Sequence, residues 1–284
     1  MSGEVSVIVP TLNAARRLGP ALASVAAEGP PVREVLVVDG GSRDATVELA
    51  RRSGATVVHE SRPLLAARVT GILRAVGEFS LLLDADQRIV PGSIGRALRR
   101  APEVDMLCLS ERAEHRSTWT QRLLDDSKRI VQSNPTEFLT PFSGLFMPRW
   151  FRTDQLKTAA GQIPAQALEV VTDRDHQILY YEVWKRHPRV AVVDDALVHD
   201  EPATLSELMA KSFRWGVGAG HLRATHLYDE LLRRPALAGR RPERGHGGGR
   251  DLRRAESRAN LSVAIKSVPY GVGYLLGRVG VPLP

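Results

Sequence analysis

The chain has almost no cysteine, with Cys108 alone among 284 residues. A single thiol excludes an internal disulfide framework and fits a reducing compartment. Cys108 lies in the apolar run Met106-Leu107-Cys108-Leu109, which favours a buried, inert thiol over a reactive one. With 43% hydrophobic and 25% charged residues, the composition is that of an ordinary globular protein built on an apolar core.

The N-terminal residues show no signal-peptide pattern, and the apolar C-terminal segment is interrupted. The first residues of the chain enter a strand pattern directly, so we expect no leader. Residues 259–284 are mostly apolar, but Lys266, Pro269, four glycines and Arg278 interrupt them. A spanning helix needs about 20 predominantly apolar residues. This segment therefore fits better a surface that lies on a membrane or packs on the protein.

Positive charge is concentrated at the C-terminal end. Residues 201–284 hold 14 basic and 7 acidic side chains, which accounts for the whole net charge of +7. Residues 233–250 are rich in Arg, Pro and Gly and predict a flexible basic linker. We expect residues 221–284 to form this linker and a C-terminal amphipathic segment on an anionic membrane surface, with docking or an oligomer contact as the alternative.

Apolar runs alternate with amphipathic stretches in the first half, as in a largely parallel sheet flanked by helices. The expected strands are 5–9, 34–38, 56–59, 79–83 and 104–109, and the expected helices are 15–27, 43–53, 64–76 and 92–100. Residues 115–165 look irregular and aromatic. Beyond them we expect a helix at 173–187, short strands at 189–193 and 197–198, and a helix at 204–216.

Two carboxylates, Asp84 and Asp86, follow the apolar run that begins at Phe79. The carboxyl end of a strand in an open α/β sheet is where ligands bind. Two acids placed there favour a hard divalent cation such as Mg²⁺ or Mn²⁺, with substrate phosphates completing its coordination. The alternative is a strand followed by a polar turn, since Asp is a common turn residue.

Other polar residues follow the first two expected strands. Asp39 ends the second apolar run before Gly40-Gly41, where its carboxylate could accept a hydrogen bond from a nucleotide base. The first strand ends at Pro10, Thr11 and Asn13, in a loop that could wrap one side of a nucleotide.

These segments together resemble the inverting family-2 glycosyltransferases of the GT-A fold. The resemblance rests on IVPTLN at 8–13, VVDGGSRDAT at 37–46, LLLDADQ at 81–87, TDRDHQILYYEVWKRHP at 172–188, VHDEPATL at 198–205 and KSFRW at 211–215. It implies a GT-A domain over residues 1–220, with a nucleotide-sugar-binding half at 1–110 and an acceptor-side half at 111–220.

The resemblance also implies roles for residues on the donor side. Asp39 would read the base, and Asp84, Ala85 and Asp86 would bind the donor diphosphate and the metal. Arg68, in the matching segment Leu65-Ala66-Ala67-Arg68, would contact the donor.

Further roles follow for the second half of the chain. The catalytic base of the family ends a Glu-Asp motif, which matches Arg174-Asp175, so Asp175 is the expected base and Asp173 the alternative. His199 would reach the metal or the diphosphate. Lys211 stands where processive relatives have Gln, and Arg214 and Trp215 are expected on the acceptor side.

The expected function is metal-dependent, inverting transfer of a sugar from GDP-mannose or a UDP-sugar to an acceptor hydroxyl or phosphate, which could be lipid-linked. We expect a peripheral location at the cytoplasmic face of a membrane. A nucleotidyltransferase would show a glycine-rich loop after the first strand, and Pro10-Thr11-Leu12-Asn13 is not one. A nucleic-acid-binding module is the other alternative, but the tail has few aromatic residues for base stacking.

Overall fold

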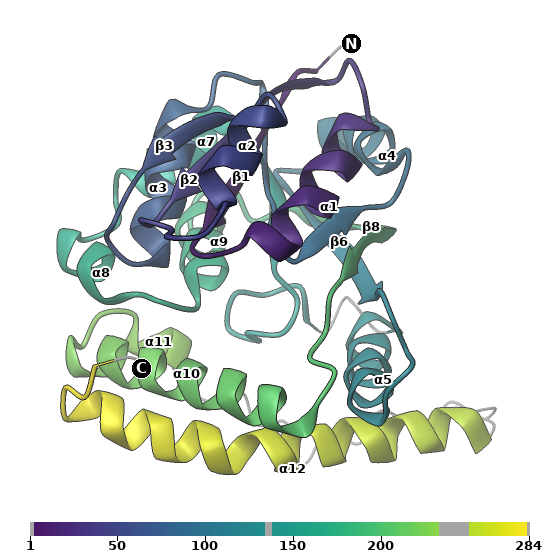
Figure 1. Ribbon diagram of the computed structural model, residues 1–284, viewed down its shortest axis with the longest axis vertical. Helices are drawn as coiled ribbons and strands as arrows, with labels where there is room; N and C mark the ends of the chain where they lie inside the picture. Colours follow the sequence, from purple (N-terminus) through teal and green to yellow (C-terminus); the bar gives the residue numbers. More distant parts are fainter. Residues whose placement is uncertain (1–2, 134–137, 233–249, 283–284) are drawn as a thin grey trace. The chain divides into compact units, whose positions relative to one another are not determined.

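The computed structural model describes residues 3–133, 138–232 and 250–282. The chain divides into two compact units (Figure 1). The sheet unit comprises Met1–Glu111 and Met147–His199, and the helical unit comprises Arg112–Phe146 and Asp200–Pro284. The domain division at residue 220 stays a prediction, and the basic linker expected at 233–250 lies, except for Arg250, outside the described residues.

An eight-stranded sheet, in the order β3-β2-β1-β4-β7-β6-β8-β5, organises the sheet unit. Pairing is parallel from β3 through β4 and antiparallel where β7 joins β4 and β6 and where β5 joins β8. The expected sheet flanked by helices is confirmed, although its second half is mixed. The strands are β1 (Val5–Thr11), β2 (Val32–Asp39), β3 (Thr56–His59), β4 (Phe79–Leu82), β5 (Gln87–Ile89), β6 (Met106–Ala113), β7 (Pro148–Arg152) and β8 (Val190–His199).

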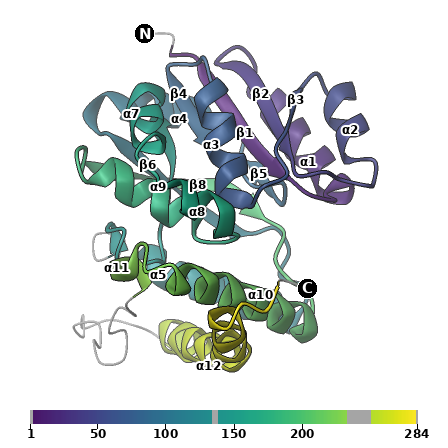
Figure 2. The same ribbon diagram turned by 90° about the vertical axis from the view of Figure 1, so that its left-hand side faces the viewer.

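Helices cover this sheet because each presents an apolar stripe to it. The helix α3 packs on β1 and β2 (Figure 2), α1 against β5, and α4 against β8. The strand β1 is buried along its whole length, as expected of a central strand covered on both faces. The helices of this unit are α1 (Ala15–Ala26), α2 (Thr46–Arg52), α3 (Leu64–Arg74), α4 (Ser93–Arg100), the 3₁₀ helix η1 (Ala101–Glu103), α7 (Thr153–Ala160), α8 (Ala165–Val170) and α9 (Asp175–Trp184).

The expected elements of the first half are present, with ends shifted by a few residues. The two short strands expected at 189–193 and 197–198 are one strand, β8. The irregular pattern expected at 115–165 was wrong, because it contains a helix of 15 residues and the strand β7. The aromatic side chains that suggested irregularity include Trp150 and Phe151, which are buried in β7.

The helical unit contains α5 (Trp119–Ser133), α10 (Leu205–Ala224), α11 (Asp229–Leu232) and α12 (Arg250–Arg278). The helix α12 packs beside α10 and also contacts α5. A capping box starts α10: Thr204 accepts from the backbone of Glu207, and the Glu207 side chain accepts from the backbone of Thr204. No helix in the described part of the chain is long and apolar enough to cross a membrane.

Glycines allow α10 and α12 to pack with their backbones in contact. A Cβ added at Gly216 would collide with the main chain of Tyr270, and one at Gly220 with that of Tyr274. In the other direction, a Cβ at Gly273 would meet the main chain of Phe213. Small residues four apart on each helix permit such an approach. Residue numbers rise together along the contact, so the two helices run parallel.

We predict that Gly273→Ala destabilises the protein, because its methyl group would push the two backbones apart. Overpacking of this kind costs about 1–3 kcal/mol in the free energy of unfolding, measured by urea denaturation. Gly271→Ala is the matched control: it lies on the same helix, and nothing lies within 4 Å of its added Cβ. This control should be neutral or stabilising by up to about 1 kcal/mol, since alanine is the better helix former. Equal effects of the two substitutions would contradict the close packing.

Candidate functional site

The ends of β1 and β2 lie next to each other, because the register pairs Thr11 with Asp39. The Asp39 carboxylate is buried and accepts hydrogen bonds from the backbone of Gly41 and Ser42, both at 2.9 Å. The Ser42 hydroxyl donates at 2.5 Å and the Thr11 hydroxyl at 3.3 Å. Burial disfavours the charge of Asp39, but these hydrogen bonds outweigh it and lower the pKa. Asp39 therefore stabilises the turn after β2. That Asp39 recognises a nucleotide base stays a prediction.

The loops after β1 and β2 are joined by side chains. The Asn13 amide oxygen accepts from the backbone of Arg43 at 2.9 Å, and the Asn13 backbone donates to the Ser42 hydroxyl at 2.8 Å. Asn13 has a φ of 49°, a left-handed conformation that asparagine tolerates better than most residues. Pro10 lies within β1, which continues to Thr11. These contacts hold in place the loop that we expect to lie beside the nucleotide.

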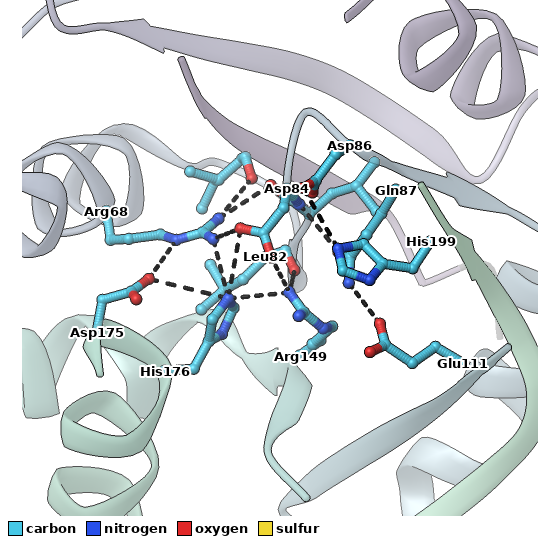
Figure 3. A network of polar contacts seen from close by, with 12 residues as sticks. Arg68, Leu82, Asp84, Asp86, Gln87, Glu111, Arg149, Asp175, His176 and His199 are labelled. Carbon is cyan, nitrogen blue, oxygen red and sulfur yellow. Dashed lines mark hydrogen bonds and ion pairs between the residues drawn. The ribbon is translucent and has the colours of Figure 1, made fainter. Parts of the chain in front are cut away.

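Asp84 lies at the centre of a polar cluster at the end of β4 (Figure 3). Its carboxylate is bound by Arg68 on one oxygen and by Arg149, at 2.9 Å, on the other. Burial alone would raise the pKa of Asp84, but the two guanidinium groups hold it well below its usual range. The charge of Asp84 is thus balanced within the protein, and its role as a metal ligand stays a prediction.

Arg68 lies on α3 with a fully buried side chain, and it joins Asp84 to Asp175. Its Nε donates to the Asp175 carboxylate at 2.8 Å, and its Nη1 donates to the Leu83 carbonyl at 3.0 Å. A buried cation needs such partners, because an unpaired charge in the interior is costly. Two residues expected at the site from the sequence, Arg68 and Asp175, are therefore in direct contact.

Two members of this cluster, Arg149 and His176, were missed from the sequence. The His176 Nε2 lies 2.9 Å from a guanidinium nitrogen of each of Arg68 and Arg149. Burial and the two positive charges lower the pKa of His176. A neutral ring with its lone pair on Nε2 can accept from both arginines. His176 adjoins Asp175 in the sequence, but nothing near Arg149 forms a motif, and only the pairing of β7 with β4 brings it here.

Asp86 and His199 form a second group in the same unit. The His199 Nε2 lies 3.3 Å from the Asp86 carboxylate, and both side chains are largely buried. The strands β5 and β8 bring them together, because Gln87 is paired with His199 in the register. A Glu111 carboxylate oxygen lies within 4.8 Å of a His199 ring nitrogen, and Glu111 also accepts from Gln87 at 2.7 Å. The carboxylate suits Mg²⁺ or Mn²⁺, and the imidazole beside it favours a transition ion such as Mn²⁺ over Mg²⁺.

Asp173 lies two residues before α9, and its environment differs from that of Asp175. Burial raises its pKa to about 7; the nearby Arg174 opposes this rise, and the charge of Asp175 adds to it. Arg174 has a φ of 60°, so the chain turns sharply between the two acids. A carboxyl group with a pKa near neutrality can exchange a proton at physiological pH.

Ala85 separates Asp84 from Asp86 and packs against the apolar core of the sheet unit. The residues expected on the acceptor side, Arg214 and Trp215, belong to the helical unit and lie on α10. The Trp215 side chain is 39% exposed, and the Lys211 ammonium lies 5.3 Å from the centre of its ring.

Comparison with known sequences identifies relatives of the sheet unit. The family model described as "Glycosyl transferase family 2" matches residues 6–153. The chain is 36% identical over 96 residues to the uncharacterized glycosyltransferase Rv0539 of Mycobacterium tuberculosis, a match that covers 33% of this chain and 42% of that protein. It is 37% identical over 91 residues to glycosyltransferase AglE of Haloferax volcanii, covering 29% and 30%. The chain spans less than half the length of these relatives.

Solved structures with low sequence identity share the fold. The TarS 1–349 structure of S. aureus has a TM-score of 0.53 at 21% identity and covers 98% of this chain and 92% of its own. Glucosyl-3-phosphoglycerate synthase of Mycobacterium tuberculosis has a TM-score of 0.52 at 20% identity, covering 82% and 81%. These similarities confirm the expected GT-A type of α/β fold.

The family match spans the loops of Asp39 and Asp84, the helix that carries Arg68, and Arg149 on β7. It therefore includes most of the polar cluster described above. The chain belongs to glycosyl transferase family 2, as expected from its sequence.

Proposed function

We propose that the protein transfers a sugar, with inversion, from a nucleoside-diphosphate sugar to an acceptor hydroxyl or phosphate. The observation that carries this proposal is the convergence of Asp84, Asp86, Arg68, Asp175 and His199 around the end of β4 in a family-2 chain. These residues supply the groups that transfer requires: cations for a diphosphate, ligands for a metal, and carboxylates for proton transfer.

The donor is proposed to be a UDP-sugar, with GDP-mannose as the alternative. Support comes from the structural neighbours: TarS 1–349 was solved with UDP-GlcNAc, and glucosyl-3-phosphoglycerate synthase with Mn²⁺ and UDP. The joined loops of Asn13 and Asp39 would hold the nucleoside, and Arg68 and Arg149 would face the diphosphate.

We propose Asp173 as the catalytic base in place of Asp175. A general base must be free to take a proton near the working pH. The Asp175 carboxylate is bound by Arg68 at 2.8 Å, and protonating it would break this buried ion pair. Asp173 has a pKa raised to about 7 by burial, so it can accept the proton of the acceptor hydroxyl. Asp175 then serves to position Arg68.

Asp86 and His199 are proposed to hold Mg²⁺ or Mn²⁺. When bound, the ion would neutralise negative charge on the leaving nucleoside diphosphate. The chain's own residues would do the rest: Arg68 and Arg149 would orient the donor, and Asp173 would deprotonate the acceptor.

Asp173→Asn should lower kcat by about 10²–10⁴-fold, because the amide cannot take the proton. Asp175→Asn removes one partner of the buried Arg68, so it should lower kcat, but by less than Asp173→Asn does, because Asp84 still pairs with Arg68. It should also move the acidic limb of the pH profile of kcat/KM to lower pH, since the charge of Asp175 raises the pKa of Asp173. In the wild-type enzyme, activity should rise with pH through about 7, as the Asp173 carboxyl loses its proton. Steady-state kinetics from acid to neutral pH tests all three expectations.

Asp154→Asn is the control for this series, because Asp154 is an exposed carboxylate at the start of α7 and should leave kcat unchanged. Normal turnover by folded Asp173→Asn, together with loss of turnover in Asp175→Asn, would return the base assignment to Asp175.

Chelation of metal should lower the transfer rate by at least about a hundredfold, since metal stabilisation of a leaving group contributes several kcal/mol. Added Mn²⁺ should restore transfer in the wild type. Asp86→Asn should need a higher Mn²⁺ concentration for half-maximal rate, measured by release of nucleoside diphosphate. Full activity in excess EDTA would remove the metal from the mechanism.

We further propose that α12 lies on an anionic membrane at the cytoplasmic face and that the acceptor is lipid-linked. The helix buries its glycine face against α10 and exposes an aliphatic stripe. Steps of four and three residues place these side chains on one face. The stripe consists of Leu261, Val268, Val272 and Leu275, which are 44–71% exposed, with Val279 just beyond the helix at 75%.

The variant Val268→Gln/Leu275→Gln should bind anionic vesicles at least about tenfold more weakly, because burial of one such side chain contributes about 1.5–3 kcal/mol. Val76→Gln, an exposed apolar residue of the sheet unit, is the control and should bind normally. Vesicle sedimentation and gel filtration together test the proposal. Unchanged vesicle binding, with a change from dimer to monomer in the variant, would assign the stripe to a second copy of the chain.

A further inference from the structure

The two arginines of the polar cluster differ in how many of their hydrogen-bond donors the protein already uses. A guanidinium group carries five N–H donors, one on Nε and two on each Nη nitrogen. The Arg68 side chain is fully buried, and all of its nitrogens meet acceptors of the sheet unit. These acceptors are Asp175 on Nε, the carbonyl groups of Ile8 and Leu83 on Nη1, and Asp84 and His176 on Nη2. Arg68 therefore has no donor left for a ligand.

Arg149 uses one nitrogen, Nη1, for its contacts with the part of the chain that the structure describes. This Nη1 lies 2.9 Å from the Asp84 carboxylate, 2.9 Å from the His176 Nε2 and 3.4 Å from the Leu82 carbonyl oxygen (Figure 3). Among the described residues, the Nε and Nη2 of Arg149 have no hydrogen-bond partner. Neither is one of the unpaired polar atoms that are sealed from solvent, and the side chain is 14% exposed. We call these two nitrogens the open edge of Arg149.

An open guanidinium edge is a specific recognition element. Two neighbouring N–H donors on a planar group match two oxygens of a phosphate or a carboxylate, and they bind both at once. Recognition here depends on directed donors rather than on net charge, because Asp84 and Asp175 offset the two guanidinium groups. The edge belongs to a cluster at the end of β4, and ligands of open α/β sheets bind at the carboxyl ends of parallel strands.

His176 fixes the direction in which this edge points. Its Nε2 lies 2.9 Å from Nη1 of Arg149 and 2.9 Å from Nη2 of Arg68, so a neutral ring accepts from both arginines. The Asp84 carboxylate holds the same Nη1 from a second direction. Because the guanidinium group is rigid and planar, two acceptors on Nη1 also determine where Nε and Nη2 lie.

We propose that the open edge of Arg149 binds two oxygens of a phosphate group on the ligand, and that His176 is a positioning residue that holds this edge in place. Arg68 then orients the ligand only through Asp84 and His176. The phosphate belongs either to the nucleoside diphosphate of the donor or to a phosphate-bearing acceptor. The assignment of the ligand as a substrate rests on the proposed glycosyl transfer, whereas phosphate binding by Arg149 does not.

Calorimetry without turnover tests the open edge, with UDP, GDP and glycerol 3-phosphate as probes, each with and without Mn²⁺. Arg149→Lys should bind at least one probe about tenfold or more weakly, because lysine keeps a positive charge beside Asp84 but has no planar edge. Weaker binding of UDP or GDP would assign the phosphate to the donor, and weaker binding of glycerol 3-phosphate alone would assign it to the acceptor. Arg152→Lys, on the same strand, is the matched control and should bind as the wild type does.

Two variants test the positioning role of His176. His176→Leu removes the acceptor and should weaken the affinity for the same probe. His176→Gln should restore at least part of that affinity, because its carbonyl oxygen can accept from Nη1 of Arg149. A merely structural role would lower the urea midpoint but leave the affinity of the folded protein unchanged. Circular dichroism confirms that each variant is folded.

Equal affinity of folded Arg149→Lys and wild type for every probe would overturn the phosphate contact, as would a wild type that binds none of the probes. Wild-type affinity in folded His176→Leu would refute the positioning role. Equal losses of affinity in folded Arg68→Lys and Arg149→Lys would contradict the difference between the two arginines. Binding that depends on Arg149 in a protein that transfers no sugar would refute only the proposed glycosyl transfer.

Discussion

The ion cluster in which Asp84 lies between Arg68 and Arg149 is the interaction on which the site depends. Arg68 is fully buried, so its positive charge must be paired with nearby carboxylates to offset the cost of removing it from water. The cluster joins α3, the end of β4, β7 and the start of α9, which are far apart in the sequence. Removal of one partner would leave a buried charge unpaired, at a cost of about 3–5 kcal/mol. The same contacts that hold these elements together therefore fix the geometry of the site.

Charge balance within the cluster decides what its neighbours can do. Asp84 and Asp175 offset the two guanidinium groups, and burial and those same positive charges lower the pKa of His176. Asp86 lies beside His199. A cation proposed there would add positive charge next to an electrically neutral cluster. Of the two acids near α9, Asp175 is held by Arg68, and Asp173 is left with the raised pKa that proton transfer requires.

The sequence predicted the parts of the site that follow parallel strands and missed those that depend on long-range pairing. Asp39 and Asp84 end apolar runs, and parallel strands bring such ends to one edge of a sheet. Arg149 could not be found in this way, because β7 runs antiparallel to β4 and residues 115–165 showed no clear period. The choice between Asp173 and Asp175 also needed the structure, since a carboxylate's pKa depends on burial and on the partner that holds it.

The glycines of the C-terminal segment show that composition alone does not predict whether a helix is continuous. Counted along the chain, they suggest a broken helix, yet α12 is continuous from Arg250 to Arg278. Gly273 and Gly277 lie on the face that meets α10, where a side chain would collide with backbone. Because the small residues are used for packing, the aliphatic ones are left on the opposite face. The exposed stripe is thus a consequence of the close, parallel contact between the two helices.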